Sequence, residues 1–393
     1  MITRRRLLAA ALALPAFGMA APTPLHAQTP ASTPPADPTL WDYLTLGPAA
    51  AYSLEQPIAV LAGNVQLQME TLGLSFPIDP TDDAQRQAWS RATYYVAIPS
   101  GISSFIALDN GPALLGFDVS QVASGAEIGE SIDTLSFVRG SFDPAQVRAA
   151  QLANGYQELE LDGRPVFSLS ETAAVDLSNP IQQIALARLN NSTMLDDGTL
   201  VYAPTLTLLE AVLTSESTIA GMPFVAQAMA TLDHPLILST LLGPGAFLPD
   251  IAAQILANPS LDAIAATIES QMEQEQAPIV LSAIAGSTAG GPLVAPSGDA
   301  TPGSDPAPPL SVSKFALVYA TPEEAARAAT SIESQLETGS SLRTGEPWTA
   351  LFSSWSVAPS DTHPSVLLTL EWRDRAARTF DLVYSRDLGF ITG

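Results

Sequence analysis

The sequence predicts an α+β protein of two lobes, each of mostly antiparallel sheet with short helices packed on one face. Three observations support this class. Short apolar strands alternate with short capped helices, the tetrapeptide LVYA occurs at both 200 and 317, and turn signals such as Asp-Gly separate neighbouring strands. A repeated ferredoxin-like unit is the topology that best fits this density of short elements.

Residues 137–156, FVRGSFDPAQVRAAQLANGY, show the pattern of strand and capped helix most clearly. A strand over 132–138 is expected to end at a turn, after which Asp143 caps a helix that starts at Pro144. Asn154-Gly155 then ends that helix. Every residue type between the strand and the helix therefore has a structural task, except Arg139.

The elements that follow are predicted by the same signals. Strands over 156–161 and 166–169 are joined by Asp162-Gly163, a hairpin turn. A second capped helix begins at Thr321, where Glu324 completes a capping box. Each LVYA sequence thus predicts the end of a strand that leads into a helix.

Composition along the chain divides it into segments. Residues 1–27 are typical of an export signal, and 28–38 form a Pro-rich disordered tether. The first α+β lobe is expected over 39–230 and the second over 231–393. Within the second lobe, 288–310 is low in complexity and is expected to be a disordered hairpin connection.

The N-terminal segment begins MITRRRLLAAALALPAF and holds three arginines, an apolar stretch and no acid. The arginines followed by two leucines resemble a twin-arginine signal, and the general export route is the alternative. Cleavage near Ala27 would leave a soluble protein in the periplasm, at the cell wall or in the medium, without stable membrane insertion. An anchor that stays uncut is the other interpretation, but Pro15 and the short length disfavour it.

Charge and cysteine content exclude several function classes. There are 40 acidic against 16 basic residues, a net charge of −24, so nucleic acids and anionic lipids are disfavoured as partners. There are no cysteines, which removes disulfides, thiolate metal sites and cysteine nucleophiles. The remaining partners are an unknown protein or a small molecule.

A search for catalytic motifs gives little. The two histidines beyond the signal, His234 and His363, each precede a proline in a turn-like sequence. Asp82-Asp83 predicts a helix start, and Asp196-Asp197-Gly198 predicts a hairpin turn. No nucleophile elbow, phosphate loop or dinucleotide fingerprint occurs, so no metal, cofactor or catalytic residue is assigned.

Arg139 is the one candidate ligand-binding residue. It could bind an anion beside the helix N-terminus, or it could pair with one of the many acids as a strand-end arginine. Asn190 opens a glycosylation-like NNST sequence. A C-terminal basic group is interleaved with acids, which favours a self-paired surface; its arginines are Arg373, Arg375, Arg378 and Arg386.

The segment FVRGSFDPAQVRAAQLANGY, with the lead-in GFDVSQVASGAEIGESIDTLSFVRGSFD over 116–143, resembles a segment of uncharacterised exported bacterial proteins. The shared pattern is Arg-Gly-x-Phe-Asp, a short helix and Gly-Tyr, and it covers the central part of the chain. The resemblance implies export and no particular activity.

The sequence therefore predicts an exported protein that acts as a non-enzymatic binding or interaction module. An extracellular hydrolase that uses acidic residues, or a solute-binding protein, is the alternative. Two facing acids with separated pKa values would favour the hydrolase, and a deep cleft between the lobes would favour solute binding.

Overall fold

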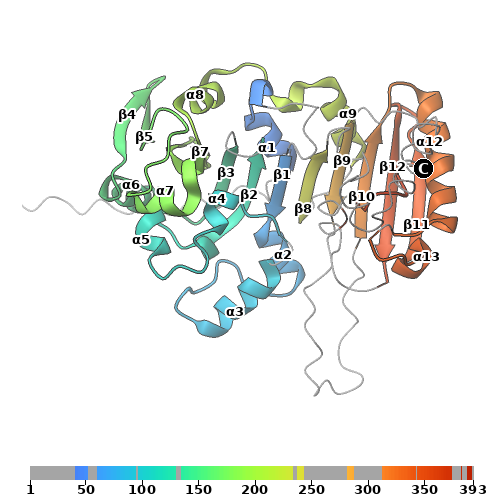
Figure 1. Ribbon diagram of the computed structural model, residues 1–393, viewed down its shortest axis with the longest axis horizontal. Helices are drawn as coiled ribbons and strands as arrows, with labels where there is room; N and C mark the ends of the chain where they lie inside the picture. The colour runs from blue at the N-terminus through green and yellow to red at the C-terminus, as the bar shows by residue number, and fades with distance from the viewer. Residues whose placement is uncertain are drawn as a thin grey trace, which may run out of the picture. The chain divides into compact units, whose positions relative to one another are not determined.

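One antiparallel sheet runs through the described residues (Figure 1). The computed structural model describes residues 40–51, 60–93, 96–129, 134–232, 237–242, 281–286, 312–341, 343–373, 382 and 387–391. The sheet has 12 strands in the order β11-β12-β10-β9-β8-β1-β2-β3-β7-β6-β5-β4. Their bounds are β1 Val60–Asn64, β2 Val122–Ile128, β3 Leu135–Gly140, β4 Gln157–Leu161, β5 Arg164–Ser168, β6 Asn191–Met194, β7 Leu200–Ala203, β8 Leu238–Leu242, β9 Leu281–Gly286, β10 Val312–Val318, β11 Phe352–Pro359 and β12 Ser365–Trp372.

The strand order is mirrored about the central pair β1 and β8. Outward from β1 the order is β2, β3, β7, β6, and outward from β8 it is β9, β10, β12, β11. In each half the third strand leads into a helix, α6 (Pro144–Ala153) or α12 (Pro322–Thr338), and a later strand returns beside it. The α+β class and the antiparallel pairing are thus confirmed. The repeated unit is a three-strand meander, a helix and returning strands, which differs from the alternating order of a ferredoxin-like unit.

The sheet is continuous across the boundary expected at 230 and 231. Val60 of β1 pairs with Leu241 of β8, and Thr240 Oγ1 donates a 2.6 Å hydrogen bond to the Val60 carbonyl. The two sequence lobes therefore share one hydrogen-bonded sheet, and where one lobe gives way to the next stays a prediction.

The short capped elements form where the sequence predicts them. The Asp143 side chain accepts from the Ala145 N–H and caps α6. Thr321 and Glu324 form the capping box of α12. Asp162 and Gly163 both have positive φ in the tight turn between β4 and β5, the conformation that favours Asp-Gly.

The LVYA segments also end strands and precede helices. The first forms β7, and Thr205 then caps α8 (Leu206–Thr214); the second ends β10 before the Thr321 cap. The strands expected on either side of 288–310 are β9 and β10, which pair with each other. Residues 1–27, 28–38 and 288–310 themselves lie outside the described residues.

Helices cover both faces of the sheet, whereas the sequence suggested one. Consecutive residues of a strand face opposite ways, and Phe137 and Val138 of β3 belong to different apolar clusters. The Phe137 face is covered by α1, α8 and α9, and the Val138 face by α2 to α7. The remaining helices are α1 Leu40–Leu46, α2 Val65–Thr71, α3 Asp83–Ala92, α4 Ser100–Ser103, α5 Gly111–Leu115, α7 Pro180–Ala185, α9 Pro223–Thr231 and α13 Trp348–Leu351, with short 3-10 turns η1 Ala49–Ala51, η3 Val119–Gln121, η4 Leu186–Leu189 and η5 Ile219–Gly221.

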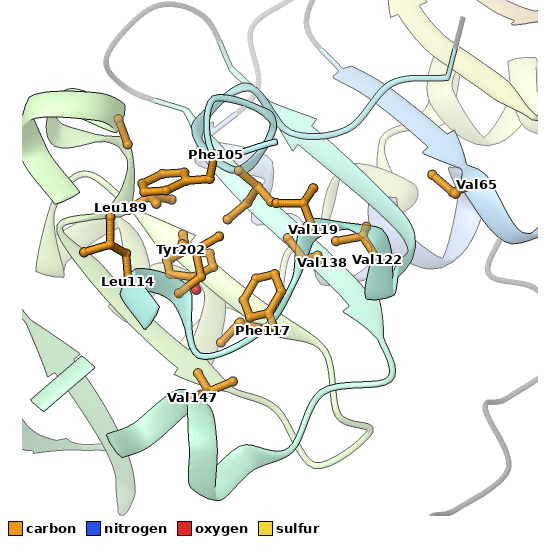
Figure 2. Close-up of a cluster of buried hydrophobic side chains, with 14 of the residues drawn as sticks. Val65, Phe105, Leu114, Phe117, Val119, Val122, Val138, Val147, Leu189 and Tyr202 are labelled. Atoms are coloured by element: carbon orange, nitrogen blue, oxygen red, sulfur yellow. The ribbon is translucent and has the colours of Figure 1, made fainter. Parts of the chain in front are cut away.

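Figure 2 shows the apolar cluster on the second of these faces. Tyr202 of β7 lies among side chains from several elements, including Leu114 of α5, Val138 of β3 and Phe117. A third cluster packs α12 against β10, β11 and β12. A helix layer on each side explains why interior strands such as β7 are buried along their whole length.

Candidate functional site

Arg139 belongs to a row of polar residues that crosses β1, β2 and β3 and reaches the start of β7. The strand register places Asn64 of β1 opposite Ser124 of β2, and Ser124 opposite Arg139 of β3. Arg139 Nε donates a 2.8 Å hydrogen bond to Thr199 Oγ1, immediately before β7. Directly opposite residues of an antiparallel pair share a face, and Ser124 and Arg139 both contact Tyr43 of α1, whereas the Asn64 side chain caps α2.

Three groups hold the Arg139 guanidinium. Its Nη2 donates to Asp197 Oδ2 at 2.7 Å, its Nε bonds to Thr199, and its Cζ lies 5.3 Å from the centre of the Tyr43 ring. The Thr199 N–H donates to the other carboxylate oxygen of Asp197 at 2.9 Å. The arginine side chain is 15% exposed and that of Asp197 is 41% exposed, so the ion pair lies where the row meets solvent.

Two groups at this row, Tyr43 and Asp197, have a pKa that is clearly shifted, in both cases away from neutral pH. Burial raises the pKa of Tyr43 far above its ordinary value, although Ser124 and Arg139 act in the opposite direction. Partial burial alone would raise the pKa of Asp197, but hydrogen bonds from Thr199 and the charge of Arg139 outweigh it and hold the pKa below its ordinary value. Tyr43 is therefore a neutral phenol 2.6 Å from Ser124 Oγ and cannot act as its base.

A second arginine reinforces the same turn. Arg164 of β5 donates to both oxygens of Asp196, at 2.7 and 2.6 Å, and the neighbouring Asp197 takes Arg139. Gly198 completes the turn with φ of +81°. The hairpin turn expected at Asp196-Asp197-Gly198 is confirmed, and its two carboxylates neutralise arginines from two other strands.

The candidate anion site at Arg139 is thus occupied by a carboxylate of the same chain. The N-terminus of α6, which was expected to share the anion, is capped by Asp143. Pairing with an acid is the alternative that the sequence left open, and the structure places Asp197 in that role. Binding of an external anion to Arg139 stays a prediction, in which the anion would have to displace Asp197.

Other sequence candidates have structural partners. Asp82 caps α3 through the N–H groups of Ala84 and Gln85, as expected for a helix start. His363 is exposed in the turn between β11 and β12, also as expected. Arg373 donates to the Thr349 carbonyl, while His234, Arg375, Arg378 and Arg386 lie outside the described residues.

The NNST segment forms a buried amide network that sequence reasoning missed. Asn190 and Asn191 are fully buried. Gln182 Nε2 donates to Asn190 Oδ1 at 2.6 Å, and Ser168 Oγ donates to Asn191 Oδ1 at 2.7 Å. Asn190 Nδ2 in turn donates to the carbonyls of Thr172 and Ala174. The asparagines therefore tie a long loop to β6, and neither is accessible to glycosylation in the folded chain.

Tyr43, Ser124 and Thr199 were also missed. Each is an ordinary residue type in the sequence, and their meeting depends on strand register and on α1. Within the described ranges, no group of three or more His, Asp or Glu side chains is arranged to hold a metal ion. None of the described helices combines the length and apolar character needed to cross a bilayer.

Comparison with known proteins gives no family. No family model and no curated protein matches the chain. Two crystal forms of a protein named TP0453 are similar to it in structure. One has a TM-score of 0.35 and 8% identity over 86% of this chain and 98% of that chain. The other has a TM-score of 0.33 and 10% identity over 89% and 100%. At these TM-scores the similarity carries no argument.

Proposed function

We propose that this chain is an exported, non-enzymatic binding or interaction module that acts outside the cytoplasm. The N-terminal arrangement of Arg4, Arg5 and Arg6 before a short apolar stretch supports export. The observation that carries the non-enzymatic part concerns the described groups whose pKa is clearly shifted, because all of them are shifted away from neutral pH.

Acid–base catalysis works best with a group whose pKa lies near the working pH. In the described part of the chain, every carboxyl with a clearly shifted pKa is shifted downward; these are Asp79, Asp82, Asp176, Asp196 and Asp197. Burial shifts the pKa of the phenols upward, at Tyr43, Tyr156, Tyr202 and Tyr319. Neither shift supplies a proton donor or acceptor near neutrality, which favours binding over hydrolysis.

The binding role is tested with the purified chain from Gln28 onward. Its thermal unfolding is followed with separate panels of sugars, peptides, small anions and metal ions, because a ligand of the native state raises the melting temperature. The same mixtures are analysed for products. A rise in melting temperature without turnover supports the proposal. Product formation that tracks the purified chain would overturn the non-enzymatic part.

Export is tested separately. The full chain, and a variant with Arg4→Lys and Arg5→Lys, are expressed in a bacterium that has the twin-arginine route. We expect the unaltered chain outside the cytoplasm with a new N-terminus near Gln28, and the variant retained. Export of both with the same cleavage would assign the general route. An uncut chain in the cytoplasm would refute export.

A further inference from the structure

Arg188 differs from the other half-buried arginines of the described chain. Arg139 and Arg164 each pair with an acid of the β6–β7 turn. Arg188, in η4, has no ion pair or hydrogen bond within the ranges the structure describes, and its buried Nε lacks an acceptor. Acidic residues outnumber basic residues 40 to 16, so a partly buried guanidinium without an acidic partner is unexpected. Leaving such a donor unsatisfied is unfavourable unless a ligand completes it.

The start of the Arg188 side chain packs against α4. α4 packs against both α7 and η4. Gly101 of α4 comes so close that a Cβ atom there would lie 3.3 Å from Arg188 Cβ and 3.0 Å from a methyl group of Leu189. The backbone of α4 therefore lies directly on the start of the arginine side chain, and the residue as a whole is half-buried.

Exposed apolar side chains lie on or beside the same elements. Of the seven large apolar residues exposed in the described chain, four lie here: Ile106 after α4, Leu186 at the start of η4, and Val175 and Leu177 in the loop before α7. Hydrogen bonds from α7 to the carbonyls of Ala174 and Leu177 hold that loop in place. Together with Arg188, these four residues are named the Arg188 surface.

Leu186 is held in an unfavourable conformation at this surface. Its φ is +55° and its ψ is −136°, a region that favours glycine, and the residue is 43% exposed. Neither the backbone nor burial of the side chain explains a leucine at this position. A ligand that covers the leucine would do so.

We propose that the Arg188 surface binds a small aliphatic carboxylic acid. The guanidinium presents a planar pair of donors that matches a carboxylate, and the neighbouring leucines would contact the aliphatic chain. The net charge of −24 repels anions, and a single carboxylate with an apolar chain meets less repulsion than a polyvalent anion. This inference deepens the proposed binding role by naming a ligand class, and it does not depend on export.

The test uses three probes and the chain from Gln28 onward, with binding measured by titration calorimetry. Hexanoate has both features of the ligand, hexanamide lacks the charge, and acetate lacks the aliphatic chain. Hexanoate should bind at least about tenfold more tightly than either of the others. Failure of hexanoate to bind, or equal binding of hexanamide, would overturn the inference.

Variants locate the site. Arg188→Gln should weaken hexanoate binding about tenfold or more, and Leu186→Gly should weaken it several-fold. Arg327→Gln, at an exposed position of α12, is the matched control and should bind as the unaltered chain does. Thermal unfolding confirms that each variant folds. Arg188→Lys keeps the positive charge but lacks the planar pair of donors, so its affinity for hexanoate should lie between those of the unaltered chain and Arg188→Gln. Unchanged binding by Arg188→Gln refutes the assignment, whereas turnover of any substrate would refute only the non-enzymatic role.

Discussion

Replacing Asp197 by asparagine should destabilise the protein, whereas the same change at its neighbour Asp196 should not. Asp197→Asn keeps an oxygen for the Thr199 N–H but removes the charge that faces Arg139. The Arg139 side chain is only 15% exposed, so its guanidinium would be left with Thr199 and the Tyr43 ring. A hydrogen bond to a charged group contributes about 1.5–3 kcal/mol, and partial exposure of Asp197 reduces the expected loss to about 1–2 kcal/mol.

Asp196→Asn is the matched control, because it changes the same chemistry in the same turn. The side chains of Asp196 and Arg164 are 84% and 34% exposed, so water replaces the lost partner and no resolvable change is expected. The free energy of unfolding is measured by urea titration with circular dichroism. A loss at Asp196 equal to or greater than that at Asp197 would refute the argument from burial.

The pH dependence of this difference gives an independent check. The pKa of Asp197 is lowered in the folded state, so its contribution to the free energy of unfolding is fully present above the unfolded aspartate pKa of about 3.9. It is lost as the pH falls through the folded pKa. The difference in stability between the unaltered chain and Asp197→Asn should therefore be smaller at about pH 3 than at about pH 6, and equal differences at the two pH values would contradict the assigned ion pair.

Two further predictions concern the backbone. Leu186→Gly should stabilise the protein by about 1 kcal/mol, because glycine adopts a positive φ without strain. Leu186→Ala should give no gain in stability. Equal free energies of unfolding for the two variants in urea would show that the Leu186 backbone is not strained. Asp143→Ala should cost about 1 kcal/mol by removing the cap from the Ala145 N–H. Ser141→Ala, two residues earlier at an exposed position, should leave the melting temperature unchanged. An Asp143→Ala variant as stable as the unaltered chain would show that α6 does not need its cap.

The candidate site illustrates where sequence reasoning reached its limit. Arg139 could be singled out because no local structural task accounted for it, and both an anion and an acid of the chain were open as its partner. The acid is Asp197, which lies 58 residues further along the chain. The choice depends on the pairing of β3 with β7, and strand pairing across such a separation leaves no local signal.

The sequence by itself determined the features that depend on neighbouring residues. These include the caps of α6 and α12, the Asp-Gly turns, the strand endings at both LVYA segments and the lack of cysteine. Capping and turn preferences act within a few residues, so they can be predicted without knowledge of the fold.

Only the tertiary structure decided how these elements combine. The β1–β8 pair joins the two lobes into one sheet, and helices cover both of its faces. Among the described residues Arg188 has no partner, while two other arginines share one turn. Each of these facts depends on segments far apart in the sequence meeting in space. The hydrogen bonds and buried surface that stabilise these tertiary contacts form between two elements, so the sequence of either element alone does not predict them.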